Sequence, residues 1–335
     1  MKPLAVVATF AAAALLAASC GGGGKKAESG GIRIGLVTDI GQLNDRGFNH
    51  LAYVGMQRAQ KQLDVQGRVA ESNSPADYVP NLSSFARQGY DLVIGVGFTE
   101  VEAMNAAAAK FPDTNFAIVD VSKDDLKKHP KNVLGLLFRE QEVGYLAGYL
   151  AGLVEKDAPG RDVIGSVGGQ KQPPVDRFIA GYQAGAKKAD PGIETINGYS
   201  QDFVDQTRCK EVALHQIDQG AQVIFQVAGG CGLGALDAAR ERSVWGIGVD
   251  ADQAFLGAHI LTSATKRVDV AVFSAIKDVV DGKFKGGDAV YGLKQNGVGL
   301  GKISPKVPKA DVDAVNKVRE DIVAGRITGI PTVVR

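Results

Sequence analysis

The chain has 335 residues, of which 45% are hydrophobic and 22% are charged, and its net charge at pH 7 is +1. This length is enough for two domains of ordinary size, and the composition is that of a globular protein. The near-neutral charge excludes a basic footprint for nucleic acid, and four histidines with three cysteines leave little room for a metal cluster. We therefore expect no nucleic-acid partner, no metal and no cofactor.

The first 31 residues are predicted to be separate from the fold. A charged start, an apolar run from Leu4 to Ala18 and the pair Ser19-Cys20 are typical of a signal peptide. We interpret residues 1–19 as that signal peptide, and residues 20–31 as a lipidated cysteine, Cys20, followed by a flexible glycine-rich tether. An ordinary secretory signal with a chance cysteine is the alternative. Since no later run reaches the roughly 18 apolar residues of a membrane span, we expect a lipid-anchored protein on the extracytoplasmic face of the cell membrane.

From residue 32 onward, short apolar runs alternate with helical patterns. The runs are rich in β-branched residues and show little alternation, which is typical of parallel strands covered on both faces. The first series of predicted strands covers residues 32–37, 67–72, 91–96, 115–119 and 133–138. The second covers residues 162–167, 194–199, 222–227 and 244–249, with helices between the strands of both series. Two such series predict an α/β protein with two doubly wound lobes.

After Asp250 the alternation weakens, and the late elements are predicted to return to lobes that are already built. We expect a first lobe of residues 32–140 plus 262–297 and a second lobe of residues 141–261 plus 298–335. Several strands would then join the lobes at a hinge, with a ligand cleft between them.

Polar and aromatic residues gather where the predicted strands end. Asp39, Asp120 and Asp250 each lie at a strand end, where they could cap loops, form an acid–base pair, or accept hydrogen bonds from ligand hydroxyl and amino groups; the third interpretation fits best. Phe48 and Phe203 lie at helix starts or loops of different lobes and could enclose a flat base between them. The alternative for both rings is a place in the core.

Cys209 and Cys231 are both predicted at the carboxyl edge of the second sheet. A compartment outside the membrane permits oxidation, so we predict a disulfide that closes a loop of roughly 20 residues, worth about 3 kcal/mol in the chain-entropy model. Two unpaired thiols are the alternative.

One stretch fits an enzyme motif, the dinucleotide pattern G-x-G-x-x-A at residues 230–235 with Asp250 twenty residues further on. We disfavour it, because the unit lies deep in the second lobe and a lipoprotein outside the cell rarely meets free NAD. No G-x-S-x-G surrounds a serine, and the four histidines show no metal spacing. We expect a protein that is not an enzyme.

Five spaced motifs resemble the basic membrane protein (Bmp) family of bacterial lipoproteins. The first is Val37-Thr-Asp39 followed by Asn44-Asp45-x-x-Phe48-Asn49, and the others lie within residues 142–148, 178–186, 246–253 and 262–268. The resemblance covers about residues 32–330. It implies a type I periplasmic-binding-protein fold and the role of a substrate-binding subunit of an ABC importer, in a family that includes purine nucleoside receptors.

The resemblance also implies roles for nine residues around a nucleoside. The rings of Phe48 and Phe203 would stack on the base, and Asp39 and Asn44 would form hydrogen bonds with its edge. Asp120 corresponds to the acid that ends a strand of the first lobe. Asp250 and Lys266 would hold the ribose, and the backbone at Gly229 or Gly230 would close over the sugar. The chain departs from the family at Asp45-Arg-Gly47, where Asp-Lys-Ser is common, and in its cysteine pair.

These observations predict a monomeric, lipid-anchored protein that closes on a purine nucleoside and delivers it to the permease and ATPase subunits of an ABC importer. Two other classes stay open: an NAD-linked or hydrolytic extracytoplasmic enzyme, and a receptor or sensor that binds a different small ligand such as a sugar.

Overall fold

The computed structural model describes residues 31–156, 158–160 and 162–334. The predicted signal peptide, Cys20 and all of the predicted tether except Gly31 lie outside the described residues. Within the described part of the chain, the helices are too short or too polar for any of them to cross a membrane.

A first six-stranded sheet contains the whole first series of predicted strands and one late strand. Its order is β11-β5-β4-β3-β1-β2, and every neighbouring pair is parallel. The strands are β1 (Arg33–Val37), β2 (Gln66–Ala70), β3 (Leu92–Val96), β4 (Asn115–Val119), β5 (Val133–Phe138) and β11 (Gly287–Tyr291). The helices of this lobe are α1 (Phe48–Leu63), α2 (Tyr78–Arg87), α3 (Val101–Lys110) and α8 (Val268–Val280).

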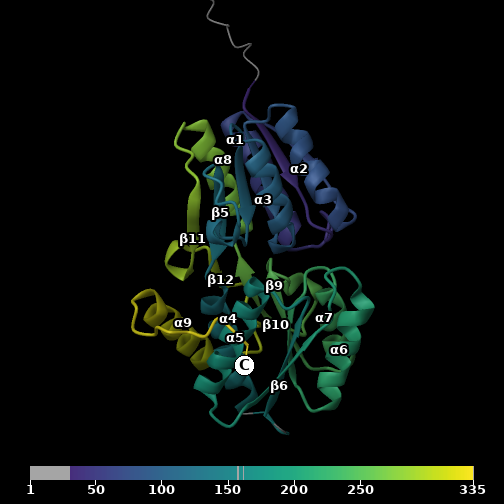
Figure 1. The fold of residues 1–335 in the computed structure, drawn as a ribbon. Helices are drawn as coiled ribbons and strands as arrows, with labels where there is room; N and C mark the ends of the chain where they lie inside the picture. Colours follow the sequence, from purple (N-terminus) through teal and green to yellow (C-terminus); the bar gives the residue numbers. More distant parts are fainter. Residues whose placement is uncertain (1–30, 157, 161, 335) are drawn as a thin grey trace, which may run out of the picture. The chain divides into compact units, whose positions relative to one another are not determined.

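The four central strands of the first sheet, β5, β4, β3 and β1, are buried on both faces, as their apolar runs predict, whereas the edge strands β2 and β11 are partly exposed. Ile34 and Leu36 of β1 share a core cluster with Met56 of α1, whereas Val37 packs in a second cluster with Leu82 of α2. Successive side chains of a strand point to opposite faces of the sheet. Helices α1 and α8 therefore cover one face, where they lie side by side, and α2 with α3 covers the other (Figure 1).

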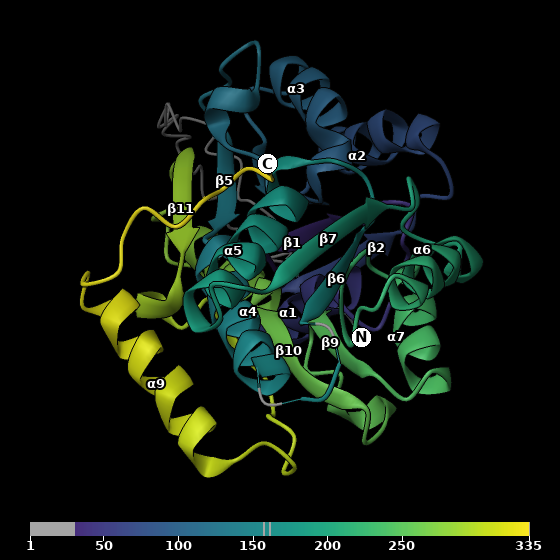
Figure 2. The same ribbon diagram turned by 90° about the horizontal axis from the view of Figure 1, so that it is seen from below.

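A second six-stranded sheet has the order β12-β10-β9-β8-β6-β7. Its strands are β6 (Val163–Gly168), β7 (Glu194–Tyr199), β8 (Val223–Val227), β9 (Trp245–Asp250), β10 (Ile260–Lys266) and β12 (Val298–Leu300). All pairs are parallel except β12 with β10. The helices are α4 (Glu140–Lys156), α5 (Pro173–Ala189), α6 (Gln206–Asp218), α7 (Gly232–Glu241) and α9 (Lys309–Val323). Figure 2 shows α4 and α5 packed together on one side of the sheet and α6 with α7 on the other. The predicted α/β fold with two doubly wound sheets is thus confirmed.

Helices α4 and α5 pack with almost no space between their backbones. A side chain at Gly148 of α4 would collide with the carbonyl oxygen of Tyr182 in α5. A side chain at each of the other glycines along the contact would likewise collide with a backbone carbonyl oxygen of the facing helix; these are Gly144, Gly152, Gly181 and Gly185. The glycine spacing in this part of the sequence therefore serves helix packing.

One predicted lobe boundary differs from the sheet order. Residues 262–266 were expected in the first lobe, but they belong to β10, which pairs in parallel with β9 in the second sheet. The physical reason is that β10 follows β9 after a short connection that contains only a 3-10 turn at Ala254–Leu256, so it pairs with the adjacent edge of β9. The chain then crosses to the first lobe after Lys266, because the following helix, α8, packs on α1.

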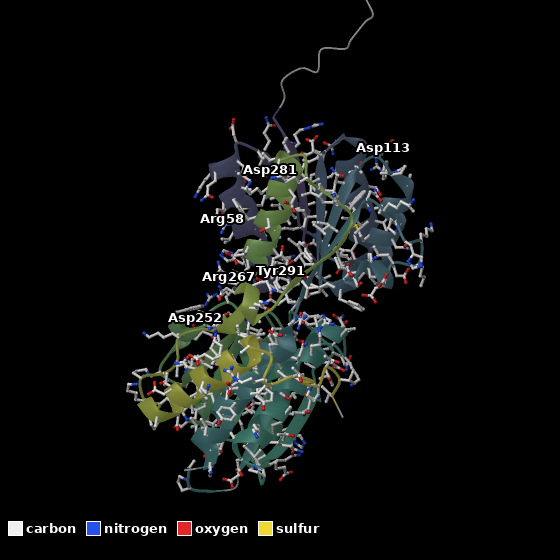
Figure 3. The ribbon with its side chains drawn as sticks, turned by 90° about the vertical axis from the view of Figure 1, so that its left-hand side faces the viewer. Arg58, Asp113, Asp252, Arg267, Asp281 and Tyr291 are labelled. Atoms are coloured by element: carbon white, nitrogen blue, oxygen red, sulfur yellow. A yellow bond between two sulfur atoms is a disulfide. The ribbon has the colours of Figure 1, made fainter. Side chains whose placement is uncertain are left out.

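Three segments cross between the two sheets: β5 to α4, β10 to α8, and β11 to β12. Backbone hydrogen bonds tie these crossings to one another. The amide of Arg139 donates to the carbonyl of Tyr291 at 3.0 Å, and the amide of Arg267 donates to that of Gly297 at 2.8 Å. Figure 3 labels Arg267 and Tyr291 where the chain passes from one sheet to the other. This is the multi-strand hinge that the weakening alternation predicts.

Candidate functional site

A cavity lies where loops at the carboxyl ends of strands from both sheets face each other. A methyl group built on Gly47 would lie 3.8 Å from the Cβ of Asp250, so the two sets of loops approach closely. Measured by the positions open to the centre of a water molecule, the cavity has about 70 Å³, several times what one water needs. The first lobe lines it with Asp39, Gly41, Asp45, Phe48, Asn49, Gly97, Phe98, Thr99 and Asp120, and the second with Gln172, Pro174, Val175, Phe178, Phe203, Val227, Gly229, Gly230, Val249, Asp250 and Lys266.

Eight of the nine residues singled out from the sequence line this cavity, and Asn44 does not. Asn44 is exposed and faces a different surface groove beside Arg46 and Gln206. The loop turns between Gln42 and Arg46, both with positive φ (55° and 53°), and thereby carries Asn44 outward. The buried amide in the cavity wall is instead Asn49, the second residue of the Phe-Asn pair in the family-like motif.

Asn49 joins two aspartates of the opening loop. Its side-chain amide donates to Asp39 Oδ1 at 2.7 Å and to Asp45 Oδ2 at 3.1 Å. The carboxylate of Asp45 also accepts the backbone N–H groups of Gly47, Asn49 and His50 at 2.9, 2.6 and 3.1 Å. Asp45 therefore supplies acceptors for amides at the start of α1, and both of its carboxylate oxygens are used in hydrogen bonds within the protein. Asp39 is held in place by Asn49 and by the amide of Gly41, which donates to it at 2.8 Å.

Burial raises the pKa of Asp39 to about 6, although the hydrogen bonds from Asn49 and Gly41 favour its ionised form. Burial also raises the pKa of Asp250, to about 7, while the ammonium of Lys266 acts in the opposite direction. Both carboxyl groups can therefore exist in either protonation state near neutral pH. In the protonated form each becomes a hydrogen-bond donor as well as an acceptor.

Lys266 contributes a cation to the cavity wall, and its side chain is only 2% exposed. Its Nζ donates to Asp120 Oδ2 at 2.7 Å and to Glu140 Oε1 at 3.1 Å. Arg177 Nε donates in turn to Glu140 Oε2 at 2.7 Å. Burial disfavours the charge of Lys266, but Asp120, Glu140 and Asp250 together raise its pKa. This buried network connects the first sheet, through Asp120, to the second sheet, through Lys266.

Aromatic rings surround the same ammonium group. The Nζ of Lys266 lies 5.0 Å from the ring centroids of Phe48 and Phe138 and 5.7 Å from that of Phe178, within the range of cation–π attraction. Glu140, Arg177 and Phe178 were not predicted as site residues. Phe178 opens one of the motifs that resemble the family, which was the available signal, whereas nothing in the sequence spacing pairs Glu140 with Lys266.

Two strand-end aspartates sit in strained backbone conformations. Asp120 has φ 70° and Asp250 has φ 62°, a region that residues other than glycine rarely adopt. Such conformations persist where the surrounding structure enforces them, commonly at functional sites. Asp120 Oδ1 is buried and has no hydrogen-bond partner among the described residues. A buried acceptor without a partner is costly, so this oxygen is suited to receive a donor from a ligand.

The two predicted rings both reach the cavity, each from its own lobe. Phe48 begins α1, and its ring lies beside Gly97, where a methyl group would be 3.3 Å from Phe48 Cε1. Phe203 lies in the loop between β7 and α6, and its ring rests so closely on Gly169 that a side chain there would overlap it. Both rings are partly exposed, and both pack with one side against the main hydrophobic core.

The glycines of the dinucleotide-like stretch have other tasks in this structure. A side chain at Gly232 would overlap that of Gln226, and one at Gly234 would overlap the backbone of Gln206. These two glycines allow α7 to pack against its neighbours, and only Gly230 of the stretch lines the cavity. The described residues hold no group of three or more metal-ligating side chains placed to bind an ion.

Cys209 and Cys231 form a disulfide, with their Cα atoms 5.5 Å apart. Both side chains are fully buried. The bond joins the first turn of α6 to the residue that follows the cavity-lining pair Gly229 and Gly230.

The sequence is similar to known proteins over nearly the whole described part of the chain. The family model described as "ABC transporter substrate-binding protein PnrA-like" (Bmp) matches residues 32–330. The chain is 36% identical over 320 residues to the ABC transporter nucleoside-binding protein BmpA of Lactococcus lactis subsp. cremoris, covering 89% of this chain and 88% of that protein. It is 35% identical over 317 residues to an uncharacterised lipoprotein of Pyrococcus horikoshii, covering 86% of this chain and 77% of that protein.

A solved structure shows the same architecture. The crystal structure of an ABC transporter solute-binding protein from Aeropyrum pernix K1 superimposes with a TM-score of 0.82 at 30% sequence identity, covering 90% of this chain and 94% of that chain. The fold expected from the resemblance, that of the periplasmic-binding proteins, is therefore confirmed.

Proposed function

The chain belongs to the Bmp family of PnrA-like ABC transporter substrate-binding proteins, and from this premise we propose that it captures a purine nucleoside in the cavity between its lobes. The observation that carries the proposal is the composition of the cavity wall. Phe48 and Phe203 enter it from different lobes, and buried carboxylates enter it beside them. A relative that is 36% identical is named a nucleoside-binding protein.

In the proposed complex, the base lies between the rings of Phe48 and Phe203. Stacked aromatic contacts of this kind contribute about 0.5–1.5 kcal/mol beyond the area that they bury. Asp39, oriented by Asn49, accepts hydrogen bonds from the edge of the base. The carboxylate can do this because it presents only acceptors when ionised.

The sugar lies against the charged network in this proposal. Asp120 Oδ1 and Asp250 accept hydrogen bonds from the ribose hydroxyl groups, and the backbone at Gly229 and Gly230 closes over the ring. An ammonium group has three N–H donors, and Lys266 directs two of them at Asp120 and Glu140. The third remains for the sugar. We do not assign Asn44 a role, since it lies outside the cavity.

We further propose that Cys20 carries the lipid and that the protein presents its ligand, as a monomer, to permease and ATPase subunits at the outer face of the membrane. Relatives named as lipoproteins support the anchor. Closure about the three crossings would bring the two lobes onto the ligand. We place the boundary between the second lobe and α8 after Lys266.

The test is calorimetric titration of the full-length protein with adenosine, guanosine, uridine, D-ribose and L-leucine. We expect a purine nucleoside to bind and to raise the melting temperature, because a ligand at 100 times its Kd adds about 2.7 kcal/mol to the stability of the folded state. Binding of D-ribose alone would favour the sugar receptor, and release of free base from the nucleoside would show an enzyme.

The phenylalanines offer a matched pair of variants. Phe48→Ala should weaken purine nucleoside binding about tenfold or more, because the stacked ring is lost. Phe255→Ala, at a ring that is 64% exposed and outside the cavity, should leave it unchanged. Equal affinity of the two variants would remove Phe48 from the site.

A further inference from the structure

The disulfide lies next to the loop that carries Phe203, since the backbone of Cys231 contacts that of Phe203. Cys209 is in the first turn of α6, six residues after Phe203, and Cys231 directly follows Gly229 and Gly230. The bond therefore connects two loops of the second lobe that both line the cavity.

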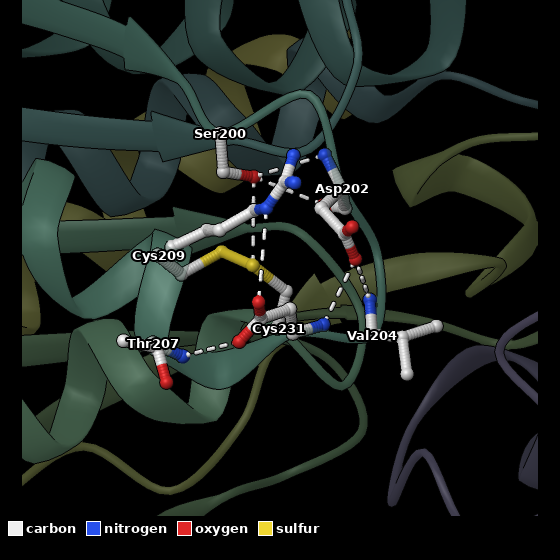
Figure 4. Close-up of polar contacts among 8 residues, drawn as sticks. Ser200, Asp202, Val204, Thr207, Cys209 and Cys231 are labelled. Carbon is white, nitrogen blue, oxygen red and sulfur yellow. Dashed lines mark hydrogen bonds and ion pairs between the residues drawn. A yellow bond between two sulfur atoms is a disulfide. The ribbon is translucent and has the colours of Figure 1, made fainter.

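The contacts between these two loops converge on the backbone of Phe203. The amide of Cys231 donates to the carbonyl oxygen of Phe203 at 3.0 Å. Methyl groups built on Gly229 and Gly230 would lie 3.4 and 3.5 Å from that same oxygen. Ser200, in the same loop as Phe203, also contacts this cysteine, with its Oγ 3.5 Å from Cys231 Sγ (Figure 4). Moving Cys231 would therefore move the backbone that carries the Phe203 ring.

The Phe203 loop is also tied along its own length. Asp202 Oδ1 accepts the backbone N–H groups of Val204 at 2.7 Å and Asp205 at 2.8 Å, which spans Phe203 on both sides (Figure 4). The ring itself rests on Gly169, where no side chain separates it from the backbone. The loop is thus held at three places: the disulfide, the Asp202 bridge and the Gly169 contact.

We propose that the Cys209–Cys231 disulfide is a positioning device for ligand binding, in that it holds Phe203 in its stacking place before the ligand arrives. This rests on the proposed nucleoside function. A ring that is already ordered loses less conformational entropy when the ligand binds, and the affinity is higher by the corresponding free energy. Both sulfurs are fully buried, so the bond acts as a permanent brace in the folded protein.

A purely stabilising disulfide would lower the unfolding free energy when removed and would leave the bound ligand unaffected. If the disulfide positions Phe203, its effect on binding must also depend on the presence of the Phe203 ring. A double-mutant cycle measures this dependence. The ring of Phe48 belongs to the other lobe and provides the matched comparison.

The experiment uses the full-length protein and whichever of adenosine and guanosine binds the parent more tightly. We expect the variant with Cys209→Ala and Cys231→Ala to bind about three- to tenfold more weakly, mostly through faster dissociation. Phe203→Ala should weaken the affinity for the nucleoside about tenfold in the parent and only about threefold in the variant without the disulfide. Phe48→Ala should cost the same in both backgrounds.

Val163→Ala is the control for general loss of stability, since Val163 lies in the same buried cluster as both cysteines and does not line the cavity. It should lower the unfolding free energy with unchanged affinity. If that double variant does not fold, Cys209→Ala alone, which also removes the bond but leaves Cys231 beside the backbone of Phe203, replaces it in the cycle and should show the same coupling to Phe203.

Unchanged affinity without the disulfide, or a Phe203→Ala effect that is equal in both backgrounds, would overturn the positioning role and leave the nucleoside function standing. Failure of the parent protein to bind either nucleoside would overturn the proposed function itself, and this inference with it.

Discussion

Replacing Asp250 by asparagine should make the protein more stable at pH 8 and leave its stability nearly unchanged at pH 4. Asp250 ends β9, is 7% exposed and faces the cavity. Burial raises the pKa of its carboxyl group to about 7, with Lys266 acting in the opposite direction. Asparagine has nearly the same shape as the protonated carboxyl group but cannot ionise.

The sign follows from proton binding in the two states. The folded protein keeps the proton on Asp250 up to a pKa of about 7, whereas the unfolded chain releases it near 3.8. Between these values the folded state holds more protons, so stability falls as pH rises and the whole penalty is present above pH 7. The difference between the two pKa values corresponds to about 4 kcal/mol. Asp45, Asp120 and Glu140 contribute to the raised pKa of Asp250, so these groups can bind part of the proton in its place. We therefore expect Asp250→Asn to raise the free energy of unfolding at pH 8 by about 2–4 kcal/mol.

The assay is the free energy of unfolding in urea, measured for the parent and for Asp250→Asn at pH 4, 6 and 8 without ligand. The stabilisation of the variant should be small at pH 4 and should grow towards pH 8. Asp113→Asn, at an exposed carboxylate in the turn before β4, should stay within about 0.5 kcal/mol of the parent throughout. The same difference between parent and Asp250→Asn at pH 4 and at pH 8 would refute the reasoning.

Three further predictions follow from the packing and the charges. Gly148→Ala should lower the unfolding free energy by about 2 kcal/mol or more, since its methyl group would meet the carbonyl oxygen of Tyr182; a melting temperature equal to that of the parent would contradict the close helix contact. Lys266→Met should lower the free energy of unfolding at pH 8 by about 3–5 kcal/mol, because it leaves two buried carboxylates without their cation. Urea unfolding measures this, and unchanged stability would mean that solvent reaches these charges. Gly169→Ala should weaken purine nucleoside binding several-fold by displacing the Phe203 ring, which calorimetry measures, while retained affinity would separate that ring from the site.

The elements of the fold were predictable because their signals are local. The predicted strands 133–138 and 194–199 agree residue for residue with β5 and β7. The run 133–138 is apolar throughout and bounded by Asn132 and Arg139, so neighbouring residues in the chain are sufficient to define it. The run 194–199 is an edge strand that mixes polar with apolar residues, and the alternation of strands and helices around it indicated its place.

The candidate site was partly predictable for the same reason. Strand ends and helix starts at one edge of a parallel sheet meet in space, which brought Asp39, Phe48 and Phe203 to the cavity. Asn44 was wrongly placed, because the direction of a side chain within a loop depends on individual backbone angles, here the positive φ values of Gln42 and Arg46. Sequence patterns carry little information about such angles outside glycine.

The sequence by itself thus determined the class of fold, the two series of strands and the loops that carry the cavity residues. The tertiary structure alone decided which charged side chains form ion pairs at the cavity. Lys266 reaches Asp120 and Glu140 across 146 and 126 positions of the chain. An ion pair of this kind forms only when two sheets and the crossing between them are packed, since both its attraction and its desolvation cost depend on burial rather than on spacing along the chain.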